Sequence, residues 1–275
     1  MTPKTFLQLF IVLAGMALGC QAGAAVNDSG AKEDWSYVGT TGPAHWGMLS
    51  TVFEACDIGK TQSPIDIGRR IVDAKFDLNM HYHPSPMVIG EDMDTRLDIS
   101  NKQTIVNMGH GLQLNFHGDR RELVAYNGQE YELIQLHFHS PSETLWHKQS
   151  FPLEIHFVHQ GKNDVLVIAV FVKGGGENEV LKTILAHVPD DKKQEHAVKG
   201  VSVNPAGLLP EDLRYYAFDG SLTTPPCTEG IHWLVLKQPV TASPAQILNI
   251  RKASGGTNAR PVQPLNGRTI YYAVP

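Results

Sequence analysis

The amino-acid sequence predicts a mostly β fold of the α+β class: one domain built on a large sheet, with a few helices at its periphery. Three observations predict it. Short apolar runs recur between turn signals, only two stretches have helical spacing, and no repeat or linker divides the chain. The 25 glycines and 17 prolines among 275 residues favour frequent turns over a helical bundle.

Several of the predicted strands alternate apolar and polar residues, as half-buried strands do. The run at 165–172 is instead apolar throughout and rich in β-branched residues, so we expect a central strand buried on both faces. The predicted strands include residues 96–100, 112–116, 131–139, 153–160, 165–172 and 231–236.

The two predicted helices differ in their signals. Residues 177–187 place Val180, Leu181 and Ile184 on one face, which is the spacing of an amphipathic helix. The second helix has a start signal, because Ser243 can act as N-cap and Pro244 follows at the first helical position.

The overall composition excludes two classes of protein. With 42% hydrophobic residues and a net charge of −5, the chain is too apolar and too weakly charged to be disordered. It has no basic stripe, so no nucleic-acid partner is expected.

The N-terminus predicts a secretory signal peptide over residues 1–24, followed by a mature domain at 25–275. Lys4 precedes an apolar run at 6–19, and small residues follow at 22–25. The run is too short to span a bilayer comfortably, so we expect no stable membrane insertion and a periplasmic or secreted location. A lipoprotein acylated at Cys20 is the alternative, although Leu18 is one position too close to the cysteine for that motif.

Cleavage of the signal peptide would leave two cysteines, Cys56 and Cys227. Two thiols in an oxidising compartment usually pair, so we expect a disulfide between them. Two unpaired buried thiols remain the alternative.

Three of the thirteen histidines occupy positions that strand geometry can bring together. Side chains alternate faces along a strand, so Gln135, His137 and His139 share one face. By the same rule Glu154 and His156 share a face of the strand at 153–160. If these strands are neighbours, one face of the sheet carries three imidazoles.

Three neutral imidazoles with an open fourth position are typical of a catalytic zinc site. A pair of histidines on one strand face is more often an ordinary surface feature. Gln135 and Glu154 favour the metal site, because each lies two residues from a candidate ligand and can accept the outward N–H of that imidazole.

Two other metal-site classes are disfavoured. His137, His139 and Glu143 resemble the first metal motif of cupins, but the flanking glycines and the second cupin motif are missing. A zinc peptidase is disfavoured because the chain has no H-E-x-x-H sequence.

Nearly the whole mature chain resembles the α-class carbonic anhydrases, and its length and cysteine positions resemble the bacterial exported members. The resemblance implies a large central, mainly antiparallel twisted sheet. It rests on WSY at 35–37, GPAHW at 42–46, QSPI at 62–65, GH at 109–110, QLHFH at 135–139, SE at 142–143, EIHFVH at 154–159, SLTTPP at 221–226 and RPVQP at 260–264.

The resemblance implies a role for each matching residue. His137, His139 and His156 match the zinc ligands, and Gln135, Glu154 and the carbonyl of Asn258 match their hydrogen-bond partners. The hydroxyl of Thr223, which acts with Glu143, matches the group that orients the zinc-bound hydroxide, and Thr224 matches its neighbour. His110 matches the proton shuttle, and Tyr37 and Gln113 match polar groups that order the solvent. The apolar wall for carbon dioxide is matched by Val158, Val167, Leu222, Ile231 and Trp233.

The implied activity is the reversible hydration of carbon dioxide to bicarbonate and a proton, by attack of a zinc-bound hydroxide. Thr144 departs from the family, because a histidine commonly follows the glutamate at 143. Exported bacterial members often form dimers, so a homodimer is an open expectation. A non-catalytic binding module and a zinc esterase are the other functions to weigh; relatives of the first kind typically lose a zinc ligand.

Overall fold

The structure is a computed structural model that describes residues 34–68, 70–82, 85–87, 102–117, 122–197 and 201–275. The predicted signal peptide, Cys20 and the predicted strand at 96–100 lie outside these residues. Within the described residues, fourteen strands form one sheet, and its main path runs in the order β13-β4-β5-β6-β8-β10-β11-β15-β14-β16-β2.

The strands have the following bounds. They are β1 Asp66–Ile67, β2 Ile71–Ala74, β3 Leu78–His81, β4 Ser85–Met87, β5 Lys102–Asn107, β6 Leu112–His117, β7 Leu123–Tyr126, β8 Gln129–His139, β9 Leu145–Trp146, β10 Leu153–Gln160, β11 Val165–Gly174, β12 Glu195–Ala197, β13 Val201–Val203, β14 Tyr215–Ser221, β15 Glu229–Ala242 and β16 Ile270–Ala273.

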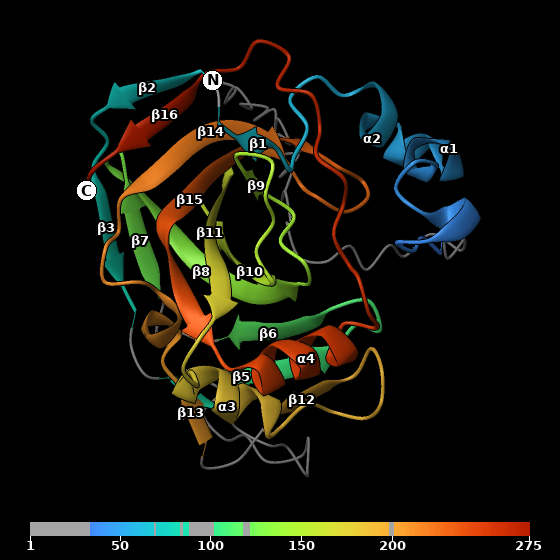
Figure 1. The fold of residues 1–275 in the computed structure, drawn as a ribbon, viewed down its shortest axis with the longest axis vertical. Helices are drawn as coiled ribbons and strands as arrows, with labels where there is room; N and C mark the ends of the chain where they lie inside the picture. The colour runs from blue at the N-terminus through green and yellow to red at the C-terminus, as the bar shows by residue number, and fades with distance from the viewer. Residues whose placement is uncertain (1–33, 69, 83–84, 88–101, 118–121, 198–200) are drawn as a thin grey trace, which may run out of the picture.

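Most neighbouring strands of the large sheet are antiparallel, and Figure 1 shows the sheet curving through the middle of the molecule. The pairs β11–β15, β16–β2 and β4–β5 are parallel. β1 and β9 form a separate parallel pair. The predicted fold class, mostly β with a mainly antiparallel sheet, is therefore confirmed.

β11 lies between β10 and β15 at the centre of the sheet, as its apolar sequence predicts. Its first eight residues are all buried, because a core covers each face of the strand. The helix-side core contains Leu136, Phe138 and Ile155, together with residues of α3 and α4. The site-side core on the other face contains Val158, Val167 and Trp233. The histidines of interest lie on the site side.

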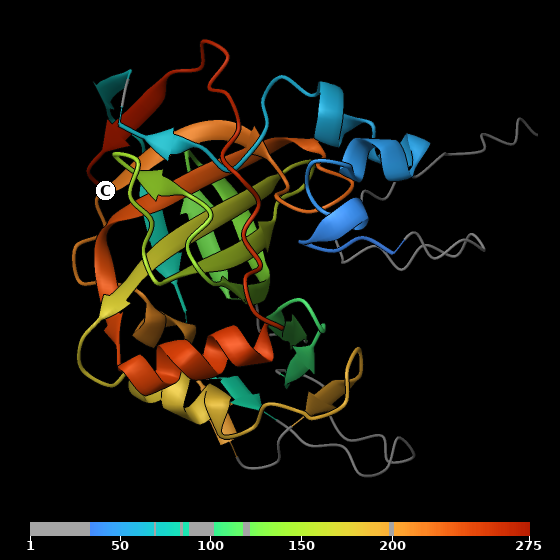
Figure 2. The same cartoon turned by 45° about the vertical axis from the view of Figure 1, so that its right-hand side comes forward.

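The two predicted helices form close to where the sequence places them. α3 spans Glu179–Leu185. The Asn178 side chain accepts from the N–H groups of Val180 and Leu181, so the helix begins after this cap and not at 177. α4 spans Pro244–Ala253, and Ser243 with Gln246 forms a capping box at its start. Figures 1 and 2 show α3 and α4 together at the lower end of the sheet.

The expectation of only two helical stretches is wrong. The part of the chain that the structure describes adds two single-turn helices, α1 at Trp46–Leu49 and α2 at Ala55–Ile58, and three 3-10 helices at Gly39–Thr41, Thr51–Phe53 and Pro205–Leu208. Segments of three or four residues are too short to repeat an apolar position, so periodicity does not reveal them. α1 and α2 lie beside the sheet, at the right of Figure 1.

The long connection from α4 to β16 passes over the sheet, as the red trace in Figures 1 and 2 shows. Its backbone is tied to distant segments, because Asn258 N–H donates to the Ser140 carbonyl and Gln263 N–H donates to the Pro64 carbonyl. This connection supplies Asn258 and Arg260 to the site described below. Among the described residues, no helix has the length and apolar character needed to cross a bilayer.

Candidate metal centre

His137, His139 and His156 converge on one point of the site-side face. β8 and β10 are antiparallel neighbours, and their register places His156 directly opposite His137. The three ring centroids lie 4.5 to 5.1 Å apart. One side-chain nitrogen from each residue lies within 4.8 Å of the other two. The strand alternation read from the sequence therefore brings all three predicted ligands together.

Partners on the far side of two rings fix their orientation. Nδ1 of His137 lies 2.7 Å from Oε1 of Gln135, and Nδ1 of His139 lies 2.7 Å from the carbonyl oxygen of Asn258. Since these oxygens can only accept, both Nδ1 atoms carry a proton and both Nε2 atoms keep a lone pair. The lone pairs face the centre of the cluster.

His156 is oriented from the same strand. Its Nε2 lies 3.1 Å from Oε1 of Glu154, which leaves Nδ1 for the centre of the cluster. Glu154 is held in turn by the N–H of Thr144, 2.8 Å from its Oε2. Thr144 thus supports the site through its backbone N–H.

The donor set fits a zinc ion. Burial lowers the pKa of His137, His139 and His156, so all three imidazoles are neutral at pH 7, the form that binds a metal. Nε2 of His139 is buried without a hydrogen-bond partner among the described residues. A buried nitrogen lone pair without a partner is costly, and a cation would satisfy it. Three neutral imidazoles are the ligands of a catalytic zinc site.

Glu143 lies beside the cluster and is fully buried. Its Oε1 accepts a hydrogen bond of 2.8 Å from the N–H of Arg260 and lies 3.4 Å from Nδ1 of His139. Burial raises the pKa of Glu143 well above its usual range, and the hydrogen bond from the Arg260 N–H offsets only part of this effect. Its Oε2 has no hydrogen-bond partner among the described residues.

The loop that carries Thr223 is fixed to the N-terminal region. A disulfide joins Cys227 to Cys56 of α2, with a Cα–Cα distance of 5.0 Å, so the predicted pairing is confirmed. Nε2 of Gln62 also donates to the Cys227 carbonyl, at 3.0 Å. The loop closes on itself through hydrogen bonds from Cys227 N–H to Thr224 and from Leu222 N–H to the Thr228 carbonyl.

The predicted apolar wall is assembled from neighbouring strands. Val158 of β10 lies opposite Val167 of β11, and Val167 lies opposite Trp233 of β15. Ile231 belongs to the same core, and Leu222 packs against it. The indole of Trp233 lies 4.9 Å from the imidazole of His156, measured between ring centroids, so the wall adjoins the cluster.

The residues predicted to carry or order protons are Gln113, His110 and Tyr37. Gln113 of β6 lies opposite His137 in the register of β6 and β8. The ring of His110 lies 6.4 Å from that of Tyr37 and 4.4 Å from that of Trp35. Burial, with smaller effects from Lys193 and His139, lowers the pKa of His110 to about 4.

The sequence did not indicate a role for Arg260 or Trp35, although both lie in motifs shared with the family, RPVQP at 260–264 and WSY at 35–37. The guanidinium of Arg260 is buried and donates to Oε1 of Gln62 and to the carbonyls of Ser63 and Cys56. Arg260 therefore connects Glu143 to the segment that carries the disulfide. The sequence signal for this role was the position of Arg260, two residues after Asn258.

Comparison with known proteins identifies the family. The model of the eukaryotic-type carbonic anhydrases matches residues 41–274. A carbonic anhydrase of Pectobacterium carotovorum is 41% identical over 239 residues, which is 86% of this chain and 90% of the relative. One of Neisseria gonorrhoeae is 37% identical over 269 residues, 98% of each chain. The chain belongs to the eukaryotic-type, or α, carbonic anhydrase family.

Solved structures of this family have the same fold. The α-carbonic anhydrase of Thermovibrio ammonificans, solved with the inhibitor sulfanilamide, superposes with a TM-score of 0.73 at 39% identity. The match covers 86% of this chain and 98% of that one. The family resemblance drawn from the motifs is thus confirmed. α-Carbonic anhydrases are zinc enzymes, and this chain keeps three clustered histidines.

Proposed function

We propose that this protein catalyses the reversible hydration of carbon dioxide, with zinc held by His137, His139 and His156. The observation that carries the proposal is the convergence of three neutral imidazoles. The outward nitrogens of His137 and His139 are hydrogen-bonded, and that of His156 lies 3.1 Å from a Glu154 carboxylate oxygen. Membership of the carbonic anhydrase family supports it. Zinc in such a site activates a water molecule for attack on the substrate carbon.

Thr223 and Glu143 would orient the attacking water. The Thr223 hydroxyl would donate a hydrogen bond to the Glu143 carboxylate, whose Oε1 is held by the Arg260 N–H. With its own proton committed, the hydroxyl oxygen of Thr223 can only accept from the water. A lone pair of that water is then directed at the carbon of carbon dioxide.

The substrate would rest against the apolar wall formed by Val158, Val167, Leu222, Ile231 and Trp233. Carbon dioxide has no net charge or dipole, so an apolar surface beside the centre suits it better than a hydrated one. Thr224, on the same loop as Thr223, offers a polar contact for the product bicarbonate.

Hydration releases one proton for each bicarbonate formed, and we assign its first acceptor to a ring nitrogen of His110. Tyr37 and Gln113 would order the water between the centre and this ring. The pKa of His110, about 4 in the position seen here, makes the ring a weak base while it is buried. Proton transfer through His110 therefore depends on solvation of the ring, because burial is the main cause of its low pKa.

We further propose that the protein is exported to the periplasm or secreted. The disulfide between Cys56 and Cys227 supports this location, because disulfides persist in oxidising compartments and are rare in the cytosol. Fractionation of cells that express the full chain, followed by mass determination of the mature protein, tests it.

The hydration proposal is tested by stopped-flow measurement of carbon dioxide hydration, with zinc content determined on the same samples. We expect about one zinc per chain, activity lost on chelation and activity restored by zinc. His139→Ala should lose both zinc and activity, whereas the exposed His147 offers a matched control, His147→Ala, that keeps both. Full zinc occupancy without hydration would instead favour a non-catalytic binding module.

A further inference from the structure

A chain of polar side chains leads from the metal centre along β6. Gln113, Asn115 and His117 share the site-side face of this strand, because the intervening Leu114 and Phe116 belong to the helix-side core. In the register of β6 and β8, Gln113 lies opposite His137, and Asn115 lies opposite Gln135. The polar row thus starts beside a metal ligand.

Hydrogen bonds connect this row to a neighbouring strand. Nε2 of Gln113 donates to Oδ1 of Asn115 at 2.6 Å, and Nδ2 of Asn115 donates to Oε1 of Glu195 at 2.8 Å. Glu195 begins β12, which pairs with β5. Its Oε2 accepts from the hydroxyl of Thr104 at 3.2 Å and lies 3.4 Å from Nε2 of His117.

The row passes from the interior to the solvent. Asn115 is only 8% exposed, whereas the side chains of His117 and Glu195 are 50% and 52% exposed. His117 is four residues beyond Gln113, which corresponds to about 13 Å along a strand. A proton that reaches His117 from the centre must therefore travel through water along this polar face.

The reaction needs such an acceptor. His110 is packed against Trp35, and its pKa of about 4 in this position makes it a weak base at neutral pH. His117 lies in a different environment, because it is half-exposed and has a carboxylate beside it. The charged group beside it is the carboxylate of Glu195 on β12.

We propose that His117, oriented by Glu195, is a second proton acceptor for carbon dioxide hydration, at the rim of the site. The proposal rests on the proposed function. Nε2–H of His117 faces the Glu195 carboxylate, so Nδ1 takes up the proton released when water adds to carbon dioxide. The imidazolium that forms is stabilised by Glu195 and returns the proton to a buffer base, which regenerates the neutral ring.

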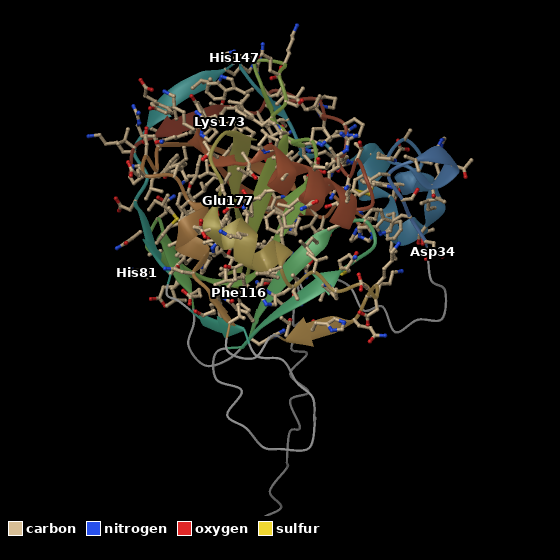
Figure 3. All side chains as sticks on the ribbon, turned by 60° about the horizontal axis from the view of Figure 1, so that its bottom comes forward. Asp34, His81, Phe116, His147, Lys173 and Glu177 are labelled. Atoms are coloured by element: carbon tan, nitrogen blue, oxygen red, sulfur yellow. A yellow bond between two sulfur atoms is a disulfide. The ribbon has the colours of Figure 1, made fainter. Side chains whose placement is uncertain are left out.

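Oxygen-18 exchange between carbon dioxide and water tests this proposal on the zinc-loaded protein. It gives two rates: the interconversion of carbon dioxide and bicarbonate, and the proton-dependent release of labelled water. The variants are His117→Gln and Glu195→Gln, each made alone and with His110→Ala. His81→Gln is the matched control, because His81 is an exposed histidine on β3, and Figure 3 shows it well apart from Phe116, the neighbour of His117.

With His110→Ala present and little buffer, we expect His117→Gln to slow water release at least about threefold, and Glu195→Gln to slow it less. Interconversion should not change, and added imidazole should restore water release. Unchanged water release in both double variants, with normal interconversion, would overturn the second acceptor. Absence of interconversion in the zinc-loaded wild type would instead overturn the proposed function.

The tautomer of His117 provides a readout that does not depend on activity. Nitrogen-15 chemical shifts of the ring should show the Nε2–H tautomer in the wild type and a larger Nδ1–H population in Glu195→Gln. A ring that is mainly Nδ1–H in the wild type would contradict the proposed orientation, because Nδ1 could then not accept the proton.

Discussion

Thr223 shows how one side chain can control the chemistry of a site without touching the metal. Thr223→Ala should keep zinc, because the three histidines and their partners are unchanged. We expect kcat/KM to fall on the order of 10²-fold, about 2–3 kcal/mol, because the attacking water loses its orientation and one hydrogen bond. Glu143→Gln should act in the same direction, since an amide can donate to the hydroxyl and reverse its polarity. Wild-type kcat/KM in both variants at full zinc occupancy would remove this pair from the mechanism.

His110 offers a second test at the scale of one residue. His110→Ala leaves the histidine cluster and Thr223 in place, so kcat/KM should change little while kcat at low buffer concentration falls. Small imidazole buffers should restore kcat, because they can replace the missing acceptor. An equal loss of kcat and kcat/KM, with no effect of imidazole, would assign His110 a role in the hydration step itself.

At the scale of elements, the disulfide connects the Thr223 loop to α2. It joins residues 171 apart in sequence, and a bond closing a loop of this size contributes about 5 kcal/mol in the chain-entropy model. Cys227→Ser should therefore lower the midpoint of urea unfolding and also reduce kcat/KM, because the loop loses its attachment. Thiol titration of the denatured, unreduced protein should find no reactive pair, and two reactive thiols would refute the bond. Cys56→Ser, which cuts the same bond outside the loop, separates loss of the disulfide from a local effect at Cys227.

The strands and helices differ in how far they could be predicted. β10 matches its predicted bounds at 153–160, because the apolar run that marks it is a local feature of the sequence, and the structure buries both of its faces. α4 begins at Pro244 as predicted, since its N-cap signal is local. α1 and α2 could not be predicted, because single-turn helices depend on what packs against them, here the aromatic cluster around Trp46 and the disulfide.

At the scale of the whole molecule, buried histidines make stability depend on pH. His159 is fully buried, its Nε2 lies 2.6 Å from the Tyr82 hydroxyl, and burial lowers its pKa to about 4. The unfolded chain binds the proton more strongly, so the free energy of unfolding should decrease as the pH falls from about 6.5 to 4. The full effect is about 3 kcal/mol.

Urea unfolding of His159→Gln and the wild type at pH 7 and pH 4.5 measures this effect. The variant is expected to be less stable at pH 7, because it disturbs the contact with Tyr82, yet to lose less stability on acidification. His147→Gln, at an exposed position, should follow the wild type at both values. Equal losses in the wild type and His159→Gln would show that His159 does not contribute to the acid sensitivity.

The sequence by itself determined which side chains share a strand face, and with the family resemblance it named the three histidines, Gln135 and Glu154. It could do so because alternation is a local property of an extended chain. Only the tertiary structure decided that β8 and β10 are neighbours with His156 opposite His137. The oxygen of Asn258, 119 residues after His139, was indicated by the family resemblance and not by any local pattern. The contacts of Arg260 with Glu143 and of Glu195 with Asn115 were also decided by the tertiary structure, because each joins residues far apart in the sequence. Strand order and register arise from burial summed over the whole sheet, so no short pattern in the chain specifies them.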